Sequence, residues 1–311
     1  MTEGIEKIVP PAGSAYVVMR IAKICQQLTR NYSVMFGAIV LGFVIFIAIF
    51  APYLDTMDPG AIDLAWRNNK PGVKHFTILP DGTVQEWTYR MGTDTLGRDT
   101  YSRVIYGAQV SLAVGFLVAM LSLAIGLVIG LVAGYIRWLD AIVLRLMDGL
   151  MAIPGILLAI TMVSLVNASL LTLILAIAIP EIPRVVRLVR SIVLSIRDEP
   201  YVEAAVSVGT RLPMILLRHL LPNIVAPLIV MGTYICGSAI LVEAVLSFLG
   251  VGISPETPTW GNIMAEGRLL FRIYPHNILF PGIFLAATLL AINMLGDGLR
   301  DTLDPRMRKR L

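Results

Sequence analysis

Residues 201–222, YVEAAVSVGTRLPMILLRHLLP, carry the signal of a short, partly polar helix between strongly apolar segments. The signal begins with Glu203-Ala204-Ala205, continues with Gly209, and closes with Leu221-Pro222. A membrane protein that keeps such a segment in a cytosolic loop presents it to a soluble partner. The stretch therefore predicts the membrane half of a machine whose energy source is another polypeptide.

The composition indicates a chain that resides in lipid. Of its 311 residues 57% are apolar and 15% are charged, and the mean hydropathy is +0.78, whereas soluble domains carry about 25% charged residues. The net charge of +4 is no argument for nucleic-acid binding, and none is expected. The two cysteines, Cys25 and Cys236, predict no disulfide. Without Cys or His at metal-ligand spacing, no metal site is predicted.

Six apolar runs are long enough to cross a bilayer, which takes about 20 residues per helix. Each is expected to be helical, because lipid offers no partner to backbone polar groups. The predicted spans are 34–54, 108–136, 141–166, 169–190, 222–250 and 277–296. A long, mostly polar stretch precedes the first span, which is therefore expected to be an uncleaved anchor. The fold class is an all-α integral membrane protein with six transmembrane helices.

Lysine and arginine are unevenly divided between the loops on the two sides of the membrane, and this difference predicts the orientation of the chain. The segments on the side of the N-terminus hold 17 of the 25 basic residues, and the opposite loops hold 8. We therefore expect a cytoplasmic tail at 1–33, a loop outside the membrane at 55–107, a core transmembrane domain at 108–296, and a basic cytoplasmic tail at 297–311.

The loop at 55–107 is the largest soluble piece. Turn signals at Pro80-Asp81-Gly82 separate 77–79 from 83–87, which predicts a short hairpin. Some fifty residues are marginal for an independent core, so no separate domain is expected.

The predicted coupling segment is a helix within 198–213 on the cytosolic face. Asp198 suits an N-cap and Pro200 suits a helix start, while Gly209 and Pro213 are helix breakers. One apolar stripe is expected from its spacing, formed by Tyr201, Ala204, Ala205, Val208 and Leu212. By spacing alone, an interfacial helix that only caps the bundle is an equal alternative.

The order of these residues resembles the coupling motif of bacterial ABC-importer permeases. That motif consists of Glu-Ala-Ala, then Gly after three further residues, and a later Leu-Pro. In this chain it falls on Glu203, Ala204, Ala205, Gly209, Leu221 and Pro222. His219 stands where the general motif often has Ile, and a basic pair before Leu-Pro is familiar in the peptide-permease branch.

Other motifs point to the same branch. They are Gly92–Asp99, Leu246–Gly252, Pro258–Gly261, Asn293–Asp301 and Leu303–Pro305. In this order they resemble the C-type subunit of dipeptide/oligopeptide importers (DppC/OppC type) over roughly residues 34–306. The resemblance implies a type I ABC-importer permease (MetI-like) fold.

The resemblance also implies partners and a location. They are a homologous B-type permease, two ATP-binding-cassette ATPases that hold ATP and Mg, an extracytoplasmic solute-binding protein, and the lipid of a bacterial cytoplasmic (inner) membrane. This chain would hold no cofactor and would have no catalytic residue. Transport would proceed by alternating access.

Candidate site residues fall into two further groups. Glu181, Glu243 and Phe248 are candidates for the translocation path, because a carboxylate in lipid is costly and usually faces a cavity or partner. The alternatives are a salt bridge of Glu181 to Arg184 or Arg187, and a solvated Glu243 at the outer rim. The candidates for docking of the binding protein are Asp94, Arg98 and Asp99. A local charge network is the alternative for this second group.

No phosphate-binding loop and no hydrolase motif occurs in the sequence. Coupling to a partner ATPase is therefore preferred over a membrane enzyme. A secondary transporter without ATPases is the main rival, although acids within the spans are few. Peptide is the leading substrate, with glutathione, nickel complexes and oligosaccharides as alternatives.

Overall fold

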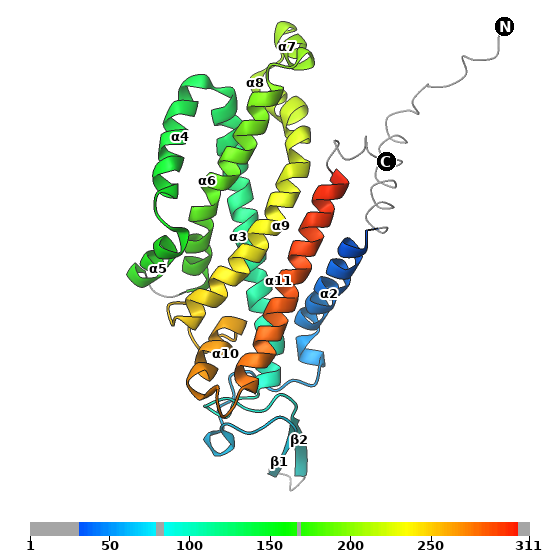
Figure 1. The fold of residues 1–311 in the computed structure, drawn as a ribbon, viewed down its shortest axis with the longest axis vertical. Helices are drawn as coiled ribbons and strands as arrows, with labels where there is room; N and C mark the ends of the chain where they lie inside the picture. Colours follow the sequence, from blue (N-terminus) through cyan, green and yellow to red (C-terminus); the bar gives the residue numbers. More distant parts are fainter. Residues whose placement is uncertain (1–30, 79–83, 167–168, 304–311) are drawn as a thin grey trace, which may run out of the picture.

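The computed structural model describes residues 31–78, 84–166 and 169–303. The predicted tail 1–33 falls almost entirely outside these residues, as do 304–311 of the predicted C-terminal tail and the hairpin turn at Pro80–Gly82. The described chain is mostly helical, in agreement with the predicted all-α class. Figure 1 places the hairpin and the short helix α7 at opposite ends of an elongated bundle.

The first helix and the loop after it lead into the bundle. Helix α2 (Tyr32–Ile49) is followed by the short turns Ala51–Tyr53 and Leu64–Trp66. The strands β1 (Val73–Ile78) and β2 (Val84–Tyr89) then pair antiparallel from Val73↔Tyr89 to Ile78↔Val84. The predicted hairpin is therefore confirmed, with longer strands than expected.

The bundle is built from long helices that run between these two ends. They are α3 (Thr100–Tyr135), α4 (Arg137–Met151), α5 (Gly155–Leu165), α6 (Leu170–Ile196), α9 (Leu221–Phe248) and α11 (His276–Leu303). Helix α10 (Trp260–Gly267) and the turn Arg268–Leu270 lie between α9 and α11, while α7 (Pro200–Ser207) and α8 (Leu212–Ile215) lie between α6 and α9. A π-helical turn, Leu216–Leu220, joins α8 to α9.

Length and apolar composition mark four membrane-spanning candidates in the described part of the chain: α2, α3, the run Leu212–Phe248, and α11. The pair α4 and α5 makes a fifth if the two helices are counted together. Helix α6 has 27 residues, and its four charged side chains between 181 and 190 keep it out of that set. With α6 as a further span, the arrangement is consistent with the six predicted helices.

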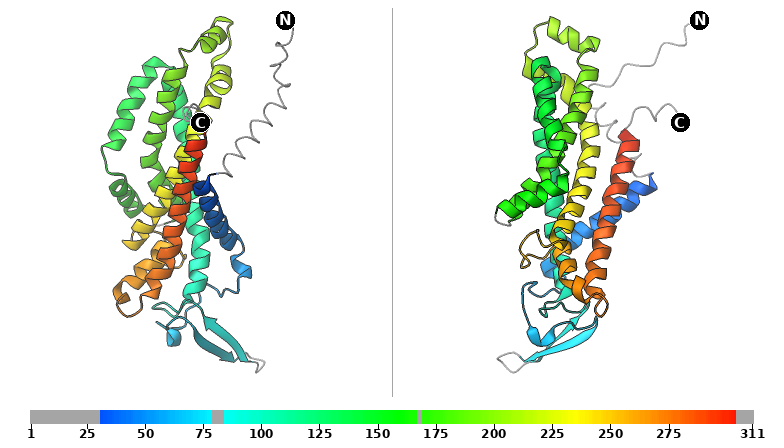
Figure 2. Two further views of the ribbon diagram at one scale, coloured as in Figure 1. Left: turned by 45° about the vertical axis from the view of Figure 1, so that its right-hand side comes forward. Right: turned by 60° about the vertical axis from the view of Figure 1, so that its left-hand side comes forward.

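The predicted third span, 141–166, is not one straight helix. Helices α4 and α5 are bent by 81° at the break before Gly155, and α5 projects away from α4 in Figure 2. Pro154 explains the break, because its ring prevents a continuous hydrogen-bond ladder and disfavours helix in the residue before it. Helix α3 also begins eight residues before the predicted second span, and α11 runs seven residues past the predicted sixth.

Three glycines of α3 allow it to approach α6 closely. A Cβ added to Gly126, Gly130 or Gly134 would come within 2.5, 2.7 and 2.8 Å of a valine Cβ on α6. The valines, at 185, 189 and 193, repeat with the same four-residue spacing. Small residues at this spacing form one face of a helix and let two helices pack closely.

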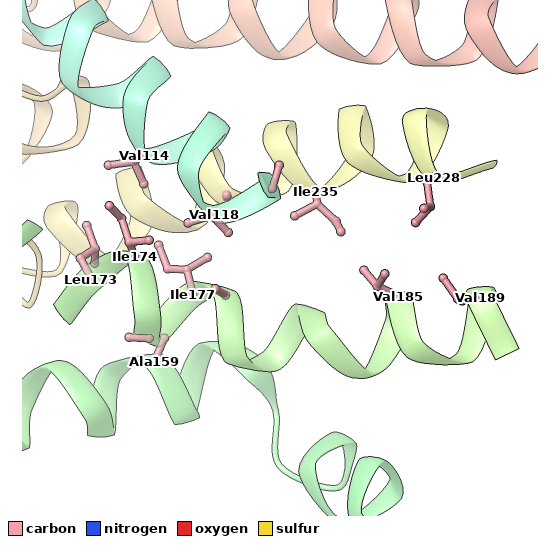
Figure 3. Close-up of a cluster of buried hydrophobic side chains, with 14 of the residues drawn as sticks. Val114, Val118, Ala159, Leu173, Ile174, Ile177, Val185, Val189, Leu228 and Ile235 are labelled. Carbon is pink, nitrogen blue, oxygen red and sulfur yellow. The ribbon is translucent and has the colours of Figure 1, made fainter. Parts of the chain in front are cut away.

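The main core joins α3, α5, α6 and α9. Figure 3 shows its side chains from these four helices, among them Val114, Ala159, Val189 and Ile235. All four are at most 1% exposed. The core continues to the coupling segment, since Val202, Ile215, Leu220 and Ile224 belong to the same cluster. The two ends of the bundle are thus parts of one packed unit.

Candidate functional site

Helix α7 contains the Glu-Ala-Ala motif and has defined ends. Glu199 is its N-cap, with extended backbone and no side-chain cap, and Pro200 follows in the first turn. The predicted N-cap, Asp198, is therefore wrong by one residue. A proline fits the start of a helix because the first N–H groups have no partner there.

A Schellman motif ends α7 at Gly209. The N–H of Gly209 donates to the carbonyl of Val206 at 2.9 Å, and the N–H of Thr210 donates to that of Ala205 at 3.0 Å. Gly209 has φ +80°, the left-handed conformation that glycine adopts without strain. A Cβ there would meet nothing within 4 Å, so the backbone angle alone requires the glycine. The predicted helix 198–213 is consequently two helices, with Pro213 in the first turn of α8.

The buried face of α7 differs from the predicted stripe. Val202 is fully buried, whereas Val208 is 86% exposed and Tyr201 is 47% exposed. Glu203 and Ala204 are exposed as well, and Ala205 is half-buried. Because α7 is one short helix seated on a single valine, most of its surface, including the motif, faces away from the bundle.

Tyr201 connects α7 to the start of α9. Its ring lies 6.3 Å from the imidazole of His219, centroid to centroid. The Asn223 side-chain amide donates to the Tyr201 hydroxyl at 3.5 Å and to the His219 carbonyl at 2.8 Å. Leu221 and Pro222 form the first turn of α9. The two halves of the motif therefore meet at one joint between α7 and α9.

Glu181 lies inside α6 between two prolines. Its side chain is buried, and both carboxylate oxygens accept from Arg184 Nη1 at 3.0 Å. Further along α6, Arg187 pairs with Asp148 at 2.5 Å and Arg190 pairs with Asp140 through two nitrogens. These ion pairs attach α4 to α6 near both ends of α4.

Glu243 is fully buried near the outer end of α9. Its carboxylate accepts from the Ser247 hydroxyl at 2.8 Å and from the Ser111 hydroxyl of α3 at 3.4 Å. Phe248 ends the helix with its side chain 37% exposed. The Arg268 guanidinium donates to the Phe248 carbonyl at 2.8 Å and lies 5.8 Å from its ring centroid.

A buried charge network lies at the N-terminal end of α3. Asp94 accepts from Arg98 Nε at 2.7 Å and from Arg103 Nη1 at 2.5 Å. Both arginines also contact Glu266 of α10 at 2.5 Å. Asp94, Arg98 and Arg103 are each at most 4% exposed. The network therefore fastens the outer loop to α10.

Asp99 has a separate role as the N-cap of α3. Its carboxylate accepts from the Ser102 N–H at 2.9 Å and from the Ser102 hydroxyl at 2.5 Å. Burial raises the pKa of Asp99 above its usual value, although the hydrogen bonds from Ser102 oppose that shift. Asp99 makes no ion pair with Arg98 within the described chain, so it is not part of the network.

Sequence reasoning assigned no role to Arg103 and overlooked Glu266. Glu266 is 163 residues away from Arg103, and no local pattern links such positions. The available signal was that Glu266 is an acid in a short helix whose other residues are mostly small and apolar. A charge that is buried in such surroundings needs a partner of opposite sign.

Comparison with known proteins assigns the class of this fold and site. Residues 126–309 match the family described as "Binding-protein-dependent transport system inner membrane component". Residues 21–71 match the "N-terminal TM domain of oligopeptide transport permease C". The chain belongs to this family of inner-membrane permease subunits of ABC transporters, as its motifs suggested.

Three relatives show the range of the family around this chain. A probable peptide ABC transporter permease of Sinorhizobium fredii is 47% identical over 96% of each chain. A dipeptide transport permease, DppC, of Alkalihalophilus pseudofirmus is 38% identical over 96% of this chain and 94% of its own. A glutathione transport permease, GsiD, of Escherichia coli is 39% identical over 91% and 89%.

A solved structure supports the fold. The chain is similar to a chain of the MetNI methionine ABC transporter with a TM-score of 0.53 and 20% identity. The match covers 64% of this chain and 95% of that one. The predicted MetI-like fold is therefore confirmed.

Proposed function

We propose that this chain forms, with a homologous permease, the pathway by which an ABC importer carries short peptides across the cytoplasmic membrane. The observation that carries the proposal is the exposed α7, which presents Glu203 and Ala204 at one end of the molecule and is joined to α9 through Tyr201. A soluble ATPase is the partner that such a helix fits. Both termini lie on the cytoplasmic side.

Transport would follow alternating access between two states of the bundle. The ATPases at one end and the binding protein at the other would each shift the equilibrium between these states. Two partner ATPases would hold ATP and Mg, and binding of ATP would close the ATPase dimer. Because Val202 packs in the main core and Tyr201 contacts the start of α9, motion of α7 would move α9 with it. The chain itself would have no catalytic residue.

The substrate proposal rests on the named relatives. Their names specify a peptide, a dipeptide and glutathione, and glutathione is itself a tripeptide. A short peptide with free charged ends is the chemistry they share. Nickel complexes and oligosaccharides are less favoured, because none of these relatives is named for them.

An extracytoplasmic binding protein would deliver the substrate to the outer end. Since Asp94, Arg98 and Asp99 are buried, we assign them an indirect role: they hold the loop that the binding protein contacts. Glu181, paired with Arg184, would line the translocation path. Glu243 and Phe248 would take part in closing the outer end of that path.

Affinity purification of the tagged chain in mild detergent, followed by mass spectrometry, tests the proposal. A second permease and one or two ATPases are the expected companions. A chain that purifies alone or as a homo-oligomer and still transports would instead favour an ATP-independent secondary transporter, whose uptake would depend on an ion gradient.

A further inference from the structure

A cavity of about 580 Å³ lies between α9 and α11 toward their cytosolic ends. Leu188 of α6 contributes to its wall, and Ala226, Val230 and Met231 of α9 add further apolar lining. Gly296 and Thr233 mark a close approach of the two helices, since a Cβ on Gly296 would lie 2.4 Å from the Thr233 hydroxyl oxygen. The volume falls in the range of about 300–1,000 Å³ that is typical of small-molecule sites.

The cavity has charges of both signs on one wall. Asp297 and Arg300 of α11 line it, three residues apart, and side chains at this spacing are neighbours on a helix face. Within the described residues, no ion pair joins Asp297 to Arg300. Asp297 lies 21 residues after His276, hence about 32 Å along the helix, at the cytosolic edge of a hydrocarbon core about 30 Å thick.

Uncharged polar groups from α9 and α11 complete the lining. Asn223, Tyr234 and Asn293 contribute amides and a phenol to the same cavity. Together with Asp297, the lining residues offer carboxylate, amide and hydroxyl oxygens, all of which can accept hydrogen bonds from an ammonium group.

We infer that this cavity is a binding site for a zwitterionic peptide on its way into the cytosol. The inference rests on the proposed function and names the residues that would hold the substrate. Asp297 binds the peptide ammonium, and Arg300 binds the carboxylate. Charge-assisted hydrogen bonds of this kind are about twice as strong as neutral ones.

The size of a dipeptide suits this pair. Two extended residues span about 7 Å, and the Cβ atoms of residues three apart on a helix are about 5–6 Å apart. The flexible arginine side chain covers the difference. The apolar wall accepts the peptide side chains and contributes no charge, so it does not select among short peptides.

Asn223 connects this site to the coupling helix. The same side chain that lines the cavity donates to Tyr201 of α7. Movement of α7 therefore reaches the cavity through one residue, and the affinity for the peptide can change with the state of the ATPases. A cavity that only holds lipid would not require a contact with the coupling helix.

The test uses the whole complex in proteoliposomes with its binding protein. Uptake of radiolabelled dialanine and of glutathione is measured beside ATP hydrolysis, for Asp297→Asn, Arg300→Gln and the exchange variant Asp297→Arg with Arg300→Asp. Asp301→Asn is the control, because this exposed acid lies on the same helix outside the cavity lining.

We expect each single variant to lower uptake by about 10-fold or more, the effect of losing one hydrogen bond to a charged group. Hydrolysis stimulated by the loaded binding protein should stay within about two-fold of the wild type, because α7 is unchanged. The exchange variant, which keeps both charges, should regain part of the uptake, and Asp301→Asn should match the wild type.

Four outcomes would overturn the inference. Unchanged uptake in both single variants removes this site but leaves the proposed function intact. A parallel fall of uptake and hydrolysis assigns the pair to coupling instead. A phospholipid found on the wild-type complex by native mass spectrometry and lost from the variants makes the cavity a lipid site. A wild-type complex that takes up neither peptide refutes the proposed substrate and this inference together.

Discussion

The Tyr201 hydroxyl of α7 accepts a hydrogen bond from the Asn223 amide of α9 at 3.5 Å, which places the coupling segment against the first turn of a membrane-spanning helix. The bond is long, so most of the contact comes from the Tyr201 ring beside His219. His219 is the residue at which this chain departs from the general motif. The departure therefore supplies a partner for Tyr201.

Replacing Tyr201 separates these two contributions. Tyr201→Phe keeps the ring and should change peptide-stimulated ATP hydrolysis by less than about two-fold, because a hydrogen bond of 3.5 Å is weak. Tyr201→Ala removes the ring and should lower stimulation about 5- to 10-fold. Val128→Ala is the control, since Val128 is 62% exposed on α3 and lies outside the coupling segment. Equal losses in the Phe and Ala variants would show that the hydroxyl dominates.

The Schellman end of α7 depends on Gly209. Gly209→Ala forces a Cβ into φ +80° and should cost about 1–2 kcal/mol, which frays α7 and reduces stimulated hydrolysis while the spans remain inserted. Gly42→Ala is the matched control, because Gly42 lies in α2 with nothing within 4 Å of an added Cβ. A Gly209→Ala complex with normal stimulation would argue against a rigid α7.

The close packing of the α3 glycines against α6 leads to a prediction about stability. Gly130→Ala places a methyl group 2.7 Å from the Val189 Cβ and should destabilise the protein by about 1–3 kcal/mol through overpacking. The readout is the fraction that remains monodisperse in detergent after heating. Gly149→Ala, with open space around the added Cβ, should be neutral or slightly stabilising. Similar melting of both variants would contradict the packing described for α3 and α6.

The outer charge network makes a second stability prediction. Arg103→Gln removes one of the two arginines that bridge Asp94 and Glu266, which leaves Arg98 alone to balance two carboxylates. It should cost about 3–5 kcal/mol, as expected for the loss of one partner from a buried ion pair. Glu86→Gln breaks the exposed pair with Lys74 and should cost at most about 1 kcal/mol. Thermal denaturation of the two variants checks the difference. Equal and small losses would mean that the outer loop is held by other contacts.

Much of the fold follows from local sequence, because lipid restricts the backbone to helices. The long apolar runs predicted α2, α3, α9 and α11, and turn residues predicted the hairpin. The break between α4 and α5 was missed although Pro154-Gly155 is visible in the sequence. An apolar run that continues through a proline is ambiguous between a kinked span and two helices.

The candidate site was predictable only in part. The motif located α7, since its residues lie within one short segment. The buried face was predicted incorrectly, because a helix of eight residues rests on Val202 and not on a stripe. The contacts of Arg103 with Glu266, and the cavity between α9 and α11, join residues far apart in the chain and required the tertiary structure.

The most direct test of the central claim is the rate of ATP hydrolysis stimulated by the loaded binding protein in a reconstituted complex with Glu203→Lys. Arg145→Glu, at an exposed position of α4 outside the coupling segment, is the charge-reversal control. If α7 is the ATPase contact, Glu203→Lys should reduce the stimulated rate nearly to the basal rate, with the complex still inserted in the membrane, while the control retains stimulation. Stimulation and peptide uptake at wild-type levels in Glu203→Lys would contradict the assignment of α7 as the coupling helix.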